Sequence, residues 1–154
     1  MKRLLSTRNI MLTVVLLMGA IPVAAVERPI ALNGNGVAAF ITDQAGNIIG
    51  ANVTGSGTAS HLGTWTLVGN VTFTPENGVL RSHPVATLTA ANGDKLEIVG
   101  DGALDLATGT DHGIFHFVGG TGRFEGASGS APFVVTVNPI TGGFELTLVG
   151  SINF

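Results

Sequence analysis

Two histidines, His112 and His116, stand four residues apart, and imidazole is a common metal ligand. On a helix this spacing would place both rings on one face, within reach of a single metal ion. On a strand the two residues lie about 13 Å apart. No HExxH pattern accompanies them, and His61 and His83 lie at the starts of other predicted strands. The pattern therefore favours histidines on a polar face or in a loop, and we expect no metal and no other cofactor.

Three carboxylates, Asp101, Asp105 and Asp111, surround a glycine-containing stretch, and calcium takes oxygen ligands of this kind. Their spacing departs from that of an EF-hand loop. We therefore expect a solvated acidic loop rather than a calcium site.

Ser128 and Glu125 are the remaining candidates for chemistry. Ser128 lies in Gly-Ala-Ser-Gly rather than in the G-x-S-x-G turn of a hydrolase, and no histidine can be assigned to it. Glu125 would be a general acid or base if burial raised its pKa. A carboxylate in a turn more often accepts backbone N–H bonds or faces water. The sequence thus assigns no catalytic residue.

The elements that must position such residues are strands. From residue 64 to 73 the chain alternates, with Trp65, Leu67, Val71 and Phe73 on one face and polar residues on the other. This period of two predicts a half-buried strand. Trp65, the only tryptophan, would floor a ligand pocket or pack in the core, and its place in a regular alternation favours the core.

The whole region after residue 25 shows the same strand pattern, with short turn sequences between the runs. Short links predict antiparallel neighbours, and closing the sheet into a barrel would bury its apolar face and remove open edges. The fold class is therefore all-β, an eight-stranded antiparallel barrel, with a two-sheet sandwich as the alternative. The predicted strands are 29–41 (with a bend or bulge at 33–36), 48–58, 62–73, 83–90, 95–104, 113–119, 130–137 and 143–154.

One glycine-rich segment, residues 119–129, follows a predicted strand directly. Glycine is used where the backbone needs a positive φ or approaches another chain closely. The segment is therefore predicted to end a strand, turn back tightly and start the next one. The residues of this structural motif are Gly119, Gly120, Gly122, Phe124, Gly126 and Gly129.

The same segment resembles the G-G-x-G-x-F-E-G-A-x-G stretch of plant allene oxide cyclases and is similar to the G-G-T-G-x-F segment of dirigent proteins. The stretches 61–63 and 89–94 also resemble small exported bacterial proteins of that barrel superfamily. The resemblance implies a calycin-like eight-stranded barrel. Because the plant relatives are trimers, it also implies a homo-oligomer, with a trimer as the expected form.

The resemblance does not extend to the catalytic residues. Allene oxide cyclases use a tyrosine and a cysteine among the polar groups of an apolar barrel, and this chain contains neither. Dirigent proteins use carboxylates and an arginine that follows the alanine of the motif, where this chain has Ser128. Kinship of fold without these residues does not carry the activity over.

The N-terminus predicts an exported protein. Residues 1–25 combine three basic residues, an uncharged apolar run and small residues before a cleavage point after Ala25, which is typical of a secretory signal peptide. The single barrel domain would then be residues 26–154. These keep four of the seven basic residues and all ten acidic ones, for a formal net charge of −6. With no basic patch, nucleic acid is not an expected partner.

These observations favour an exported, periplasmic or extracellular barrel that does not catalyse a reaction and either binds a small apolar molecule or serves a structural role. The first alternative is an isomerase or cyclase of the allene oxide cyclase or dirigent type. The second is a small outer-membrane barrel, because the alternating residues that end in Phe154 resemble the last strand of such proteins. The missing aromatic girdles argue against membrane insertion.

Overall fold

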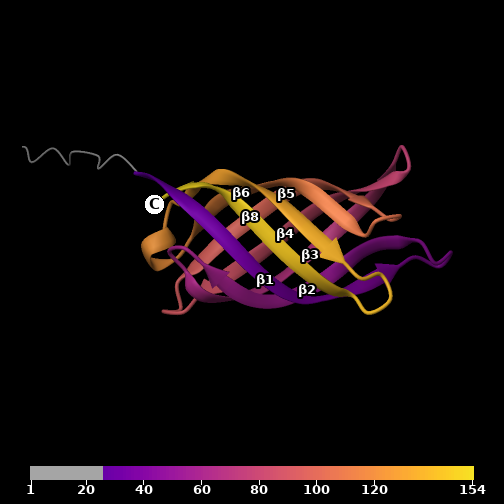
Figure 1. Ribbon diagram of the computed structural model, residues 1–154, viewed down its shortest axis with the longest axis horizontal. Coiled ribbons are helices and arrows are strands. Elements are labelled where there is room, and N and C mark those ends of the chain that lie inside the picture. Colours follow the sequence, from indigo (N-terminus) through magenta and orange to yellow (C-terminus); the bar gives the residue numbers. More distant parts are fainter. Residues whose placement is uncertain (1–25) are drawn as a thin grey trace, which may run out of the picture.

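The computed structural model describes residues 26–154, so the predicted signal peptide, residues 1–25, lies outside the described residues. The described chain is a closed antiparallel barrel (Figure 1). Its strands are β1 (Glu27–Thr42), β2 (Ile48–Ala59), β3 (Gly63–Glu76), β4 (Val79–Ala90), β5 (Lys95–Asp105), β6 (Thr110–Gly120), β7 (Ser128–Val137) and β8 (Gly143–Asn153), and a short 3-10 helix, η1 (Gly122–Phe124), lies between β6 and β7.

Every strand pairs with its neighbours in sequence, and β8 closes the barrel against β1, from Glu27 opposite Asn153 to Val37 opposite Gly143. The predicted all-β fold and closed eight-stranded barrel are confirmed. The sandwich alternative is wrong, because pairing of the first and last strands leaves no open edge. The predicted bulge at 33–36 is also wrong: the register is continuous there and shifts between Ile41 and Thr42.

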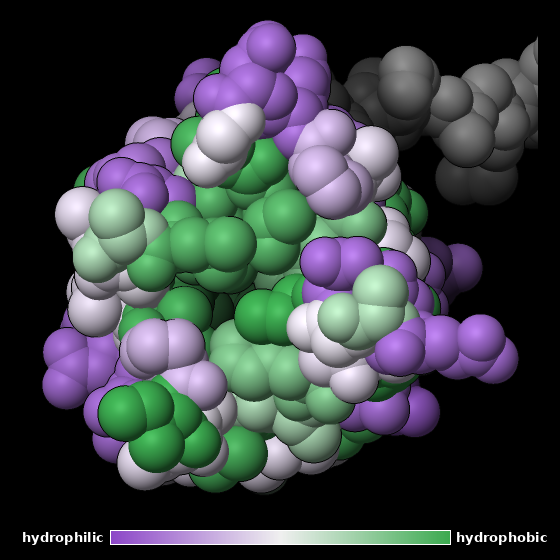
Figure 2. All heavy atoms as spheres, turned by 90° about the vertical axis from the view of Figure 1, so that its right-hand side faces the viewer, coloured by the Kyte–Doolittle hydropathy of each residue, from purple (hydrophilic) through white to green (hydrophobic). Residues whose placement is uncertain are grey.

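The two ends of the barrel differ. The turns β1–β2, β3–β4, β5–β6 and β7–β8 share one end, which we call the open end, at the right of Figure 1. Figure 2 looks onto this end and shows hydrophobic residues around a central hollow. The remaining turns, η1 and both ends of the described chain lie at the opposite end, which we call the closed end.

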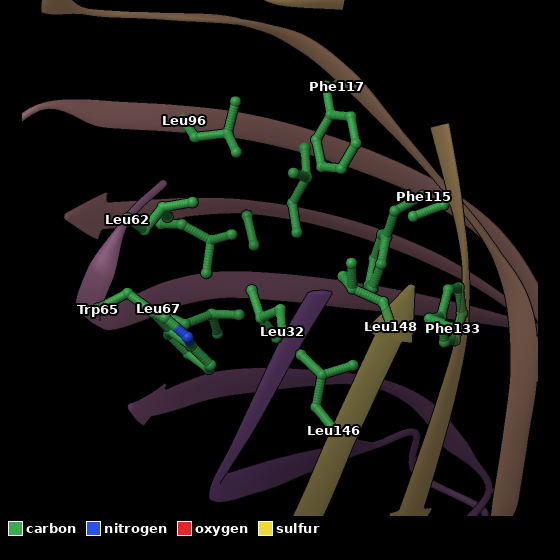
Figure 3. Packing of buried hydrophobic residues seen from close by; sticks show 14 of the residues in the cluster. Leu32, Leu62, Trp65, Leu67, Leu96, Phe115, Phe117, Phe133, Leu146 and Leu148 are labelled. Carbon is green, nitrogen blue, oxygen red and sulfur yellow. The ribbon is translucent and has the colours of Figure 1, made fainter. Parts of the chain in front are cut away.

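Side chains that alternate toward the inside of the barrel form the core. The cluster near the closed end includes Leu62, Trp65 and Leu96, each at most 2% exposed (Figure 3). Trp65 therefore packs in the core, as its alternation predicts. Toward the open end the inward positions carry Phe115 and Phe133, whose rings stack with centroids 4.2 Å apart. Large side chains thus fill one half of the barrel and line the other.

Within residues 26–154, no helix is long and apolar enough to cross a membrane.

Candidate functional site

The hollow at the open end is an apolar cavity inside the barrel. About 80 Å³ of it is open to the centre of a water-sized sphere. A single buried water needs roughly 10–15 Å³ on this measure, so the cavity has space for several heavy atoms. All eight strands contribute to the lining, which includes Phe40, Val53, Phe73, Phe115, Val135 and Phe144.

Asp111 is the one polar side chain among the residues that line this cavity. It lies on β6, on the same inward face as Phe115 and Phe117, and the residue is 8% exposed. Behind it, the hydroxyl of Ser82 on β4 donates a hydrogen bond to Asp111 Oδ1 at 2.9 Å. Ser82 is fully buried. The carboxyl group is thus fixed by a neighbour and presented to an apolar space.

Gly102 on β5 makes room for this pair between β4 and β6. A Cβ at this position would lie 2.6 Å from Ser82 Oγ, 2.7 Å from Asp111 Oδ1 and 2.9 Å from the Phe133 ring. Such distances are shorter than real contacts of a Cβ atom. Glycine at position 102 is therefore a condition for the Ser82–Asp111 hydrogen bond.

Burial controls the electrostatics of the site. Desolvation raises the pKa of Asp111, because the apolar surroundings disfavour the charged carboxylate. The Ser82 hydroxyl, the charge of His112 and the backbone of Ala103 act in the opposite direction, and their sum is smaller. The neutral carboxylic acid, which can donate a hydrogen bond, is thus favoured over a wider pH range than for an exposed aspartate.

The histidines that the sequence singles out lie elsewhere. His112 and His116 are exposed on the outer face of β6. His83 Nδ1 pairs with Asp101 Oδ1 at 2.8 Å outside the barrel, and His61 contacts the Pro29 carbonyl oxygen at the closed end. Within residues 26–154, no three or more His, Cys, Asp or Glu side chains gather where they would hold a metal ion.

The predicted solvated acidic loop is wrong for Asp111. Asp101 is exposed, and Asp105 accepts a hydrogen bond from the Ala107 N–H in the β5–β6 turn, both as expected of surface carboxylates. Asp111 differs because β6 begins at Thr110, three residues before the predicted start. The alternation of the strand therefore includes Asp111 and turns it inward.

The glycine-rich segment 119–129 plugs the closed end. Its Phe124, in η1, is 0% exposed and meets the Phe154 ring edge to face at a centroid distance of 5.2 Å. Thr121 exchanges hydrogen bonds with the backbone of Lys95 at the start of β5. The segment thus holds the Phe124 ring where it closes this end of the barrel interior.

Four glycines of this segment have positive φ: Gly119 at 124°, Gly122 at 59°, Gly126 at 72° and Gly129 at 123°. Gly120 does not, but a Cβ there would meet the Lys95 carbonyl and lie 2.9 Å from Phe124 Cβ. These are backbone demands of a tight turn and a close approach.

The other candidates from the sequence do not reach the cavity. Glu125 and Ser128 are exposed beside the plug, at the end of the barrel opposite Asp111. Trp65 lies in the core near the closed end and is not part of the cavity lining. The glycine-rich segment 119–129 and the apolar cavity therefore lie at opposite ends of the barrel.

The chain resembles known proteins in its structure and not in its sequence. No family model matches the chain, and no curated protein matches it. Among solved structures, the pterocarpan synthase dirigent protein PsPTS1 superposes with a TM-score of 0.58 at 16% identity, over 83% of this chain and 94% of that one. A second pterocarpan synthase dirigent protein, GePTS1, gives a TM-score of 0.54 at 16% identity, over 82% and 84%.

The fold is an eight-stranded barrel similar to that of these dirigent proteins. At this level of identity the likeness concerns the fold alone, so the activity in the neighbours' names describes those proteins.

Proposed function

We propose that this barrel binds a small apolar molecule in its open-end cavity and catalyses no reaction. The observation that carries the proposal is the cavity: an apolar hollow reached from one end of an otherwise filled barrel. Eight-stranded barrels either fill their interior with side chains or hold one small ligand. This chain fills the closed half with Trp65, Leu96 and Phe124 and leaves the other half lined but unfilled.

We propose that no reaction is catalysed because the chain lacks the catalytic side chains that the resemblance implies. Steering a reactive molecule requires placed polar groups that act in the transition state. The tyrosine and cysteine that resemblance would call for are missing from the sequence, and Ser128 replaces the arginine. We expect no turnover of epoxide or phenoxy-radical substrates above background.

The isomerase or cyclase alternative has one observation in its favour, the buried Asp111 carboxyl in the cavity wall. A buried carboxyl with a raised pKa is a candidate general acid. Stereoselective product formation that Asp111→Asn abolishes would establish this alternative in place of the non-catalytic one.

Export and assembly belong to the same proposal. The sequence of residues 1–25 supports export, and the resemblance supports a trimer. An apolar interior supports a binding module over an outer-membrane barrel, whose interior is polar.

The test uses a matched pair of substitutions on β7. Val135 faces the cavity, and Val134 is its neighbour on the outer face, 41% exposed. N-phenyl-1-naphthylamine, a neutral dye that fluoresces in apolar surroundings, should bind the purified protein weakly. Val135→Phe should lower its affinity by roughly tenfold because the added ring occupies the cavity. Val134→Phe should leave the affinity unchanged.

Circular dichroism of both variants would show that the barrel is intact, since overpacking costs about 1–3 kcal/mol. Equal dye affinity in the two phenylalanine variants would place binding outside the cavity. Failure of the unsubstituted protein to bind any apolar probe would favour the structural role instead.

A further inference from the structure

The one polar side chain in the cavity lining, Asp111, limits which ligands the cavity would bind. Asp111 is held at Oδ1 by Ser82, in a space that Gly102 keeps free. The backbone of Ala103 also acts on this carboxyl group. In its neutral form the carboxylic acid has one O–H, which can donate a hydrogen bond. The remaining lining offers no polar side chain, so the carboxyl group is where a ligand's polar atom would be satisfied.

We infer that the Ser82–Asp111 pair is the hydrogen-bonding anchor of the cavity, and that its ligand is a neutral apolar molecule with one acceptor oxygen, such as a ketone, ether or epoxide. This inference rests on the proposed binding function. An acceptor oxygen complements a carboxylic acid O–H, and the apolar walls complement the rest of the molecule. Ser82 acts as a positioning residue, because it holds the carboxyl group and does not line the cavity.

The surroundings of Asp111 support the neutral form. On the faces packed against it, β4 presents Ser82, β5 presents Gly102 and Leu104, and β7 presents Val135, none of which titrates. The charged group that acts on Asp111 is His112, the next residue on its own strand, and it faces outward. Within the described chain, no cation lines the cavity to hold an ionised carboxylate there.

The experiment compares three small probes of one ring each: cyclohexanone, methylenecyclohexane and cyclohexylamine. The first two have nearly the same shape and differ in the acceptor oxygen, and the third carries a cation. Affinities are measured by NMR titration of the purified protein from about pH 4 to about pH 8, a range that begins near the ordinary pKa of aspartate and extends well above it.

The unsubstituted protein should prefer the ketone to the alkene more strongly at low pH. The affinity ratio should fall by about two- to tenfold as the pH rises and Asp111 loses its proton. Asp111→Asn keeps a donor of the same shape, so the ketone preference should persist without pH dependence. Asp111→Leu should abolish the preference at every pH while methylenecyclohexane still binds.

Ser82→Ala provides a readout that a merely structural role would not move. Loss of its hydrogen bond removes one influence that lowers the pKa of Asp111. The pH midpoint of the ketone preference should therefore shift upward in this variant. An unchanged midpoint would remove Ser82 from the anchor.

The outcomes separate the two proposals. If all three probes fail to bind, the proposed function falls and the inference with it. If methylenecyclohexane binds but the ketone preference is the same in the unsubstituted protein and Asp111→Leu, the cavity binds ligands and the anchor is wrong. A preference for cyclohexylamine that grows with pH would also overturn the inference, because Asp111 would then act as an anion.

Discussion

Asp111 is a carboxyl group in apolar surroundings, and this links its protonation to the stability of the barrel. The pKa of Asp111 is raised in the folded protein. At a pH between the unfolded and the folded pKa, the folded state therefore keeps a proton that the unfolded state has released. The contribution of this group to the free energy of unfolding is therefore greatest below the unfolded pKa. It decreases as the pH rises through the folded value.

We expect Asp111→Asn to remove this dependence. The free energy of unfolding of the unsubstituted protein should fall relative to that of the variant as the pH rises from about 4. Urea unfolding of both proteins across a pH series measures the difference. Parallel curves would mean that Asp111 titrates in the folded protein as it does in the unfolded chain.

The sequence contains the pattern that turns Asp111 inward, but it does not show that Asp111 meets Ser82. Asp111 has the same parity as Phe115 and Phe117, so a strand that starts two residues earlier than predicted already turns it inward. Aspartate is rare in strands, so the predicted strand begins after Asp111 rather than before it. Ser82 lies 29 residues away in the chain, and only the register of the β4–β5–β6 pairing brings the two side chains together.

At the scale of elements, the glycine-rich segment 119–129 contains glycines that are required for two reasons, a positive φ and close contact with a neighbour. Gly122 and Gly126 both have positive φ, but they differ in their surroundings. A Cβ at Gly122 would collide with the Asp94 carboxylate, whereas nothing lies within 4 Å of one at Gly126. The two positions therefore separate strain of the backbone from steric exclusion.

We expect Gly122→Val and Gly126→Val each to lower the free energy of unfolding by roughly 1–3 kcal/mol, with the larger loss at Gly122. Ser128→Ala, at an exposed position of the same segment, should be nearly silent and serves as the control. Chemical denaturation measures all three. Glycine variants as stable as the unsubstituted protein would show that the segment accepts other residues.

Most strand bounds follow from alternation and turn residues, and the structure agrees with them within a few residues. The exceptions are informative. β4 begins at Val79 and β6 at Thr110, before the positions that alternation alone suggests. In both cases pairing with the neighbouring strands extends the element over polar residues that interrupt the apolar alternation, Arg81 and Ser82 in β4 and Asp111 and His112 in β6. The division into an open and a closed end depends on how much of the interior the side chains of all eight strands fill together. A pattern within one strand does not contain this information.

At the scale of the whole molecule, we predict that the chain is cleaved by a signal peptidase. The basic start, the apolar run and the small residues before position 26 should direct cleavage after Ala25. Intact-mass analysis of the protein from its native host should find a chain that starts near Val26. Exported material that retains residues 1–25 would contradict the signal-peptide interpretation.

The pairing of β1 with β8 also constrains how the chain folds. Glu27 lies opposite Asn153, so the barrel cannot close until the chain has been synthesised as far as β8. Folds dominated by such distant pairings form in milliseconds to seconds, far more slowly than helical proteins of this size. A chain of this topology has an open sheet edge on β1 until β8 is available to pair with it. The ring closure that stabilises the finished barrel thus postpones complete folding until β1 and β8, the first and last strands of the described chain, can pair.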